Sequence, residues 1–171
     1  KYIKNGDIFQ VVPSQRFETK YTGSVLKLYQ ALRKTNPSPF MYYFNFPGFK
    51  IVGSSPEILV RLRNKKITIR PIAGTRPRGK TKKLDNKYAE DLLKDKKEIA
   101  EHLMLLDLGR NDIGRVANKS SVKVTSEFEI EKYSHVMHIV STVEGKVSSD
   151  KTAFEALMAG FPAGTVSGAP K

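Results

Sequence analysis

Cysteine is absent from the 171 residues of this sequence, which excludes a disulfide framework and thiolate chemistry. No run of about 18 apolar residues occurs, the length that a membrane-spanning helix requires. The first residues, KYIKNGD, lack the pattern of a secretory signal peptide. Internal repeats and low-complexity linkers are also missing. These absences are compatible with a reducing compartment, and we expect a cytoplasmic protein without a membrane partner.

Acidic residues are scarce relative to basic ones, 17 against 30, which gives a formal net charge of +13. The densest basic cluster is RPRGKTKK, at residues 76–83. Such clusters bind phosphate backbones without sequence specificity, so a basic nucleic-acid-binding module is a competing hypothesis that predicts steeply salt-dependent DNA binding. The sequence has no aromatic-basic RNA motif and no zinc-ligand spacing. We therefore favour a lysine-rich surface that attracts small anionic substrates, and we expect no nucleic-acid partner.

The length and the hydrophobic content of 39% suit one globular domain or part of a larger one. Strand-like runs mix with separated helices without βαβ alternation, which predicts an α+β fold with antiparallel sheet. The expected strands cover residues 8–17, 40–46, 50–52, 58–62, 67–69, 121–124, 128–133 and 135–143. One helix is expected to begin after Ser24, and two more are expected at residues 87–108 and 152–158. A hairpin turn is expected at residues 64–65 and a loop at residues 71–79.

The most informative stretch is KEIAEHLMLLDLGRNDIGR, at residues 97–115. Glu98 and Glu101 are three residues apart, so their carboxylates share one face of a helix. Two carboxylates beside a buried segment suit an oxygen-ligated divalent cation. A solvated helix face with ordinary ion pairs is the alternative interpretation, and spacing alone leaves both open.

Two segments place glycine beside a hydroxyl, residues 72–76 (IAGTR) and 164–168 (GTVSG), where backbone N–H groups can approach an anion. His138 shares the apolar face of a strand with valines, as either a core histidine or a functional one. Glu57 follows Ser54-Ser55-Pro56 at a strand start, where it is either an exposed charge or, if buried, a general acid.

Six motifs carry a resemblance to a known family: GDIFQVVPSQRF, SSPE, RPIAGTRPRG, EHLMLLDLGRND, YSHVMHIVSTVEG and GTVSGAPK. Together they resemble the chorismate-utilising enzymes, and among these the anthranilate synthase large components. The resemblance implies that chorismate and ammonia give anthranilate and pyruvate, the first committed step of tryptophan synthesis. It also implies Mg²⁺, a glutamine amidotransferase partner subunit, and two antiparallel sheets packed face to face with outer helices.

The resemblance assigns a metal and substrate site. Glu101 matches a Mg²⁺ ligand, and Glu98 matches a supporting or alternate carboxylate. Gly74 and Thr75 match the substrate-binding pair. Ala73 stands where aminodeoxychorismate synthases typically carry a nucleophilic lysine. Because alanine has no amine, it argues against that folate-pathway alternative.

Three further residues match catalytic positions of the family. Glu57 matches the general acid that helps the ring hydroxyl leave. His138 matches the histidine that takes part in pyruvate elimination, and Thr165 matches a residue of the active-site wall. The segment Pro39-Phe40-Met41 matches a contact with the feedback inhibitor L-tryptophan; ordinary strand-core residues are the alternative interpretation there.

The resemblance covers a central part of such an enzyme, so we expect residues 1–171 to be a single chorismate-binding domain truncated at both ends. The second glutamate ligand is expected beyond Lys171. We therefore expect weak or absent metal binding by this segment alone, and no turnover of chorismate by it.

Overall fold

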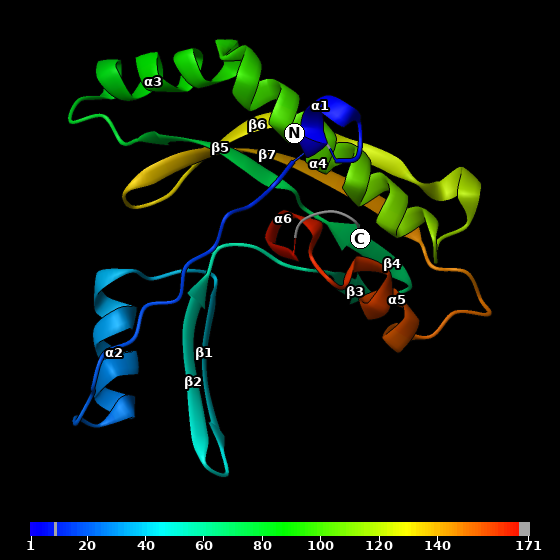
Figure 1. Ribbon diagram of the computed structural model, residues 1–171. Helices are drawn as coiled ribbons and strands as arrows, with labels where there is room; N and C mark the ends of the chain where they lie inside the picture. The colour runs from blue at the N-terminus through cyan, green and yellow to red at the C-terminus, as the bar shows by residue number, and fades with distance from the viewer. Residues whose placement is uncertain (9, 168–171) are drawn as a thin grey trace. The chain divides into compact units, whose positions relative to one another are not determined.

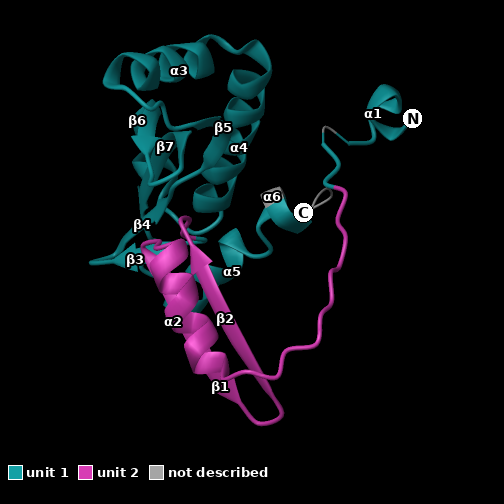
Figure 2. Cartoon of the chain, turned by 90° about the vertical axis from the view of Figure 1, so that its left-hand side faces the viewer, with its two compact units in different colours: residues 1–12, 59–171 teal, residues 13–58 magenta. Residues whose placement is uncertain are grey.

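The computed structural model describes residues 1–8 and 10–167 (Figure 1). The chain divides into two compact units, which Figure 2 draws in separate colours. The smaller unit comprises Pro13–Ile58, and the larger one comprises Lys1–Val12 with Leu59–Lys171. Among the helices of the described residues, none has both the length and the apolar character needed to cross a bilayer.

In the smaller unit, helix α2 (Val25–Thr35) packs against a hairpin of strands β1 (Phe40–Phe46) and β2 (Phe49–Ser55). The two strands pair antiparallel, and Gly48 in the turn takes a φ of 84°, which glycine adopts without steric cost. Ser24 is the N-cap residue of α2, although its side chain makes no capping hydrogen bond. The predicted helix after Ser24 and the predicted strand over residues 40–46 are confirmed.

The larger unit is built on a five-stranded antiparallel sheet. Its strands are β3 (Arg61–Arg63), β4 (Lys66–Ile69), β5 (Ile72–Pro77), β6 (Lys123–Lys132) and β7 (Val136–Lys146). Strand β6 pairs along one edge of β7, and β5 and β4 pair with successive parts of its other edge. Asn64 and Lys65 have φ values of 52° and 61° and form the predicted tight turn between β3 and β4.

Helices α3 (Lys82–Lys94) and α4 (Lys96–Gly114) lie on one face of this sheet (Figure 1). The remaining helices are α1 (Tyr2–Asn5), the 3₁₀ turn η1 (Lys119–Ser121), α5 (Ala153–Gly160) and α6 (Gly164–Ser167). The buried core lies between sheet and helices, where Leu106 and Ile113 of α4 meet Ile67 and Val143. The sheet thus provides a rigid platform for the carboxylate-bearing helix α4.

Several predicted boundaries are wrong for identifiable reasons. Residues 8–17 form no strand in the part described, because no neighbouring strand takes their backbone groups. The loop expected at 71–79 is largely strand β5, since β7 offers a pairing edge. The helix expected over 87–108 is two helices separated at Asp95, whose extended backbone ends α3 and whose carboxylate caps α4.

The two strands expected within residues 121–133 are one strand, β6, with an irregularity around Phe128 where its register with β7 shifts. The strand expected at 58–62 is confined to Arg61–Arg63. The α+β fold class with two antiparallel sheets is confirmed. The face-to-face packing of the sheets and the single-domain organisation stay predictions.

Candidate functional site

Strand β5 carries an irregularity at Gly74, where its register with β7 shifts between Ala73 and Thr75. Gly74 has a φ of 73°, which side-chain-bearing residues rarely adopt. A Cβ atom at this position would lie 3.1 Å from Leu92 Cδ1 and 3.2 Å from Glu98 Oε2. Glycine is therefore required both by the backbone conformation and by the close approach of a carboxylate from α4.

His138 lies on β7 directly opposite Thr75. Its Nδ1 atom is 2.9 Å from the carbonyl oxygen of Gly74 and 3.1 Å from Thr75 Oγ1. Because a carbonyl oxygen only accepts, Nδ1 must carry the proton in this arrangement. A neutral His138 ring then has its lone pair on Nε2, which becomes the atom able to take up and return a proton.

A chain of polar groups near the end of β6 supports the His138 ring. The Tyr133 ring meets it edge-on, with centroids 5.5 Å apart and an interplanar angle of 62°. Tyr133 Oη donates to Glu131 Oε2 at 2.8 Å, and the Arg70 guanidinium pairs with the other oxygen of Glu131. Sequence reasoning missed these supporting residues, because only the pairing of Glu131 with His138 across the strands brings them together.

The first turns of α4 carry the two candidate metal ligands. Asp95 caps the helix by accepting from the backbone N–H groups of Lys97 and Glu98. The Glu98 side chain is only 19% exposed, and Glu101, one turn later, accepts a 3.3 Å hydrogen bond from Gln10 Nε2. The two predicted carboxylates are thus side by side along α4, and Glu98 reaches the β5 irregularity.

The donor set fits a magnesium ion in its chemistry. Glu98 and Glu101 offer only carboxylate oxygens, and the absence of a side chain at Gly74 leaves room for Glu98 Oε2 beside β5. Mg²⁺ commonly binds one or two carboxylates and completes its octahedron with water and substrate oxygens. Within the described residues, no group of three or more His, Cys, Asp or Glu side chains is arranged to hold a metal.

The ring of His102 lies one helical turn after Glu98, on the face of α4 that meets the sheet, and is fully enclosed by protein. Its Nε2 is 2.7 Å from Ser141 Oγ on β7, and Ser141 Oγ also accepts the backbone N–H of Phe128 at 3.0 Å. Burial lowers the pKa of His102 from its ordinary 6.5 to about 4, so the ring is neutral at physiological pH. Sequence reasoning did not single out His102 or Ser141.

An ionic network fixes the end of β5 to the start of α3. Arg78 binds Asp85 with two hydrogen bonds of 2.9 and 3.1 Å, and Lys132 pairs with the same carboxylate at 2.9 Å. The backbone N–H of Gly79 also donates to Asp85. Hydrogen bonds from Arg78 and Lys132 hold the pKa of Asp85 well below its ordinary value. Part of the basic cluster thus has a structural role.

The other predicted residues belong to other parts of the chain. Glu57 and the segment Pro39-Phe40-Met41 belong to the smaller compact unit. Glu57 is exposed to solvent, although partial desolvation raises the pKa of its carboxyl group. Phe40 and Met41 lie on β1, with Phe40 44% exposed. Thr165 belongs to α6, and its side chain lies outside the described part of the structure.

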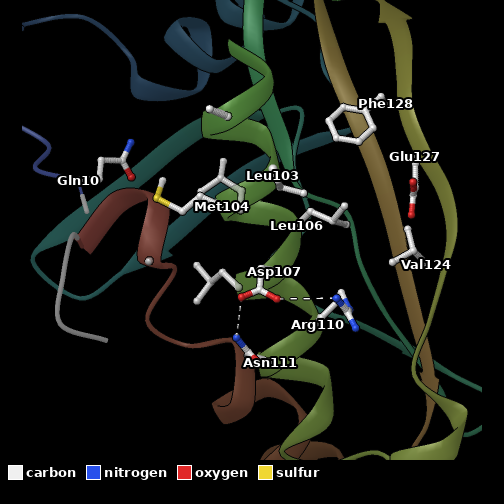
Figure 3. A pocket seen from close by; sticks show the side chains of 14 residues that line it. Gln10, Leu103, Met104, Leu106, Asp107, Arg110, Asn111, Val124, Glu127 and Phe128 are labelled. Atoms are coloured by element: carbon white, nitrogen blue, oxygen red, sulfur yellow. Dashed lines mark hydrogen bonds and ion pairs between the residues drawn. The ribbon is translucent and has the colours of Figure 1, made fainter. Parts of the chain in front are cut away.

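A cavity of about 870 Å³ lies alongside α4. Figure 3 shows Leu103, Met104 and Arg110 of α4 lining it, with Glu127 and Phe128 of β6. Its size is in the range of small-molecule sites. Asn111 donates to Asp107 at 3.3 Å, and Asp107 pairs with Arg110 at 3.9 Å, so part of the charged cluster that ends α4 is paired within the helix.

A sequence profile described as chorismate binding enzyme matches residues 1–171. The chain belongs to this family. It resembles the anthranilate synthase component 1 of Cereibacter sphaeroides, with 64% identity over 170 residues that cover 99% of this chain and 34% of that protein. The protein of the same name from Pseudomonas putida is 57% identical over 171 residues, covering 100% of this chain and 35% of its own length.

Solved structures of the chorismate binding enzyme family share the fold. Anthranilate synthase component I from Streptococcus pneumoniae superposes with a TM-score of 0.90 at 49% identity, covering 99% of this chain and 37% of that one. The menaquinone-specific isochorismate synthase from Escherichia coli has a TM-score of 0.65 at 22% identity, covering 76% of this chain and 30% of its own. The chain therefore spans about a third of the length of these relatives.

Proposed function

We propose that residues 1–171 form part of the chorismate site of an anthranilate synthase, which converts chorismate and glutamine-derived ammonia to anthranilate and pyruvate. The observation that carries this proposal is that His138 and Glu98 both approach Gly74. Its carbonyl oxygen holds His138 Nδ1 at 2.9 Å, and the Glu98 carboxylate lies against the space where a side chain would be. The names and high identity of the relatives support the same reaction.

Each residue of the proposed site has a role that follows from its chemistry. Glu101 and Glu98 would hold Mg²⁺, which supplies Lewis-acid activation of the substrate when bound. Gly74 and Thr75 would position chorismate, and the basic surface would attract its two carboxylates. Glu57, whose pKa is raised by desolvation, would protonate the departing ring hydroxyl.

His138 would exchange the proton of the later pyruvate elimination through Nε2, because Nδ1 is committed to Gly74. Thr165 would belong to the wall of the same site. In the complete enzyme we expect a glutamine amidotransferase subunit to deliver ammonia. We also expect L-tryptophan to act as a feedback inhibitor through a site that includes Pro39, Phe40 and Met41, and the enzyme to be cytoplasmic.

Aminodeoxychorismate synthase activity is the alternative within the family. That route uses an amine nucleophile at position 73, and Ala73 is a buried residue with no amine. A product assay separates the two activities directly, because the alternative yields aminodeoxychorismate in place of fluorescent anthranilate.

The test uses the natural full-length chain that contains residues 1–171, assayed with chorismate, ammonium and Mg²⁺. We expect anthranilate fluorescence, and a loss of at least about 100-fold in Glu101→Gln because an amide replaces an ionised ligand. Glu90→Gln on the exposed surface of α3 is the matched control and should retain the rate. Absence of anthranilate with the unsubstituted chain would refute the proposal.

The role of His138 has its own variant. In His138→Asn the side-chain amide can still donate to the Gly74 carbonyl, but no basic nitrogen replaces Nε2. We expect kcat to fall by about 100-fold with little change in the KM for chorismate, as removal of a general acid–base group predicts. An unchanged kcat would show that His138 moves no proton in the rate-limiting steps.

A further inference from the structure

His102 follows Glu101 in the chain and lies one helical turn after Glu98, so its side chain shares the face of α4 that carries Glu98 and is directed into the sheet. Its ring is fully buried, and its only hydrogen bond within the described structure joins Nε2 to Ser141 Oγ at 2.7 Å. Packing contacts alone hold the other buried residues of this segment, Leu105 and Leu106. The hydrogen bond between His102 and Ser141 thus gives the carboxylate helix a directional link to the centre of strand β7.

Ser141 also serves a second element. Its Oγ accepts the backbone N–H of Phe128 at 3.0 Å, at the irregularity of β6 where Phe128 has a φ of 51°. The Phe128 ring in turn packs on His102, with centroids 5.2 Å apart. One buried hydroxyl thus joins α4, β6 and β7 at a single point.

From this geometry we infer that His102 and Ser141 are positioning residues that set the placement of Glu98 and Glu101 over the sheet. The inference rests on the proposed function, because it concerns the metal-binding role of these carboxylates. Apolar packing is non-directional and tolerates small shifts of a helix, whereas a hydrogen bond does not. Slippage of α4 by one residue would move it by ~1.5 Å and turn it by ~100°, which breaks the His102–Ser141 bond.

The carboxylates leave little tolerance for such movement. Glu98 Oε2 already lies within 3.2 Å of the side-chain position at residue 74. Mg²⁺ and Mn²⁺ also demand short oxygen distances, about 2.0–2.1 Å for Mg²⁺, in near-octahedral geometry. Residues that orient metal ligands without touching the metal commonly change its affinity by about 10- to 100-fold when replaced.

The experiment measures Mn²⁺ binding to the natural full-length chain by electron paramagnetic resonance, without chorismate, so that the readout is independent of turnover. Ser141→Ala removes the shared hydroxyl, and His102→Phe removes the ring nitrogens. His102→Gln is the conservative variant, because its amide nitrogen can reach Ser141 Oγ. The matched control is Ile113→Val, a fully buried position three turns later on α4.

We expect Ser141→Ala and His102→Phe to raise the dissociation constant for Mn²⁺ about 10-fold, and His102→Gln to restore most of the affinity. The control should lose stability to unfolding without loss of metal affinity. If Ser141→Ala does not fold, the comparison of His102→Phe with His102→Gln decides the matter. Affinities that match the control in both His102 variants would overturn the inference.

The outcome is separable from that of the proposed function. A wild-type chain that binds Mn²⁺ but makes no anthranilate would refute the proposed reaction, and the variants would still test the positioning role. A wild-type chain that binds no Mn²⁺ would overturn the positioning inference itself.

Discussion

The buried histidine of α4 makes the protein sensitive to acid in a calculable way. His102 has a pKa of about 4 in the folded chain, against 6.5 for an exposed histidine, because burial disfavours its charged form. The unfolded chain therefore binds a proton between these values while the folded chain does not. The contribution of neutral His102 to the free energy of unfolding is fully present above pH 6.5, and it is lost as the pH falls toward 4.

The magnitude follows from the difference in pKa. Each pKa unit corresponds to about 1.36 kcal/mol, so His102 alone should lower the free energy of unfolding by about 2–3 kcal/mol between pH 7 and pH 4.5. The assay is urea-induced unfolding of the full-length chain at pH 7, 5.5 and 4.5. The same series on His102→Gln removes the titrating group while keeping an amide that can bond to Ser141 Oγ.

We expect the acid-induced loss of stability to be smaller in His102→Gln by about 2–3 kcal/mol at pH 4.5. Equal losses in both proteins would refute the reasoning, as would an NMR titration that gives His102 an ordinary pKa in the folded chain.

Three further predictions concern the supports of the site. Gly74→Ala should lower the free energy of unfolding by about 1–3 kcal/mol, measured by urea unfolding, because φ is 73° and the new methyl group meets the Glu98 carboxylate. Asp85→Asn should lower the urea midpoint at pH 7, since Arg78 loses its bidentate partner, and a midpoint equal to that of the wild type would contradict this. Thr152→Ala should lower the unfolding free energy by about 1 kcal/mol through loss of the capping box of α5, with calorimetry as the check.

Local sequence signals predicted much of the framework. The hairpin at Asn64-Lys65 depends on turn chemistry, and the strand at residues 40–46 and the helix after Ser24 depend on local apolar patterns, all of which act between neighbours in the chain. The motif resemblance also identified Gly74, Thr75, His138 and Glu98, which the fold brings together at β5. The motifs, and not the composition, indicated that these residues belong to one site.

Features that depend on non-local pairing were not predicted. The segment at residues 71–79 has the composition of a loop, and becomes a strand only because β7 provides a partner. The support of His138 by Glu131 and Tyr133 follows from the β6–β7 register, and the bond between His102 and Ser141 joins residues 39 positions apart. Burial of a polar side chain against a distant partner leaves no periodic signal in the sequence.

The central claim is that the carboxylates of α4, at the Gly74 irregularity, form the metal part of a chorismate site. The most direct measurement is the anomalous scattering of Mn²⁺ in crystals of the full-length chain soaked with chorismate. The account predicts an anomalous peak within about 2–2.5 Å of a Glu101 carboxylate oxygen, with chorismate oxygens completing the coordination. A bound chorismate with the metal elsewhere, or with none beside Glu98 and Glu101, would contradict the account.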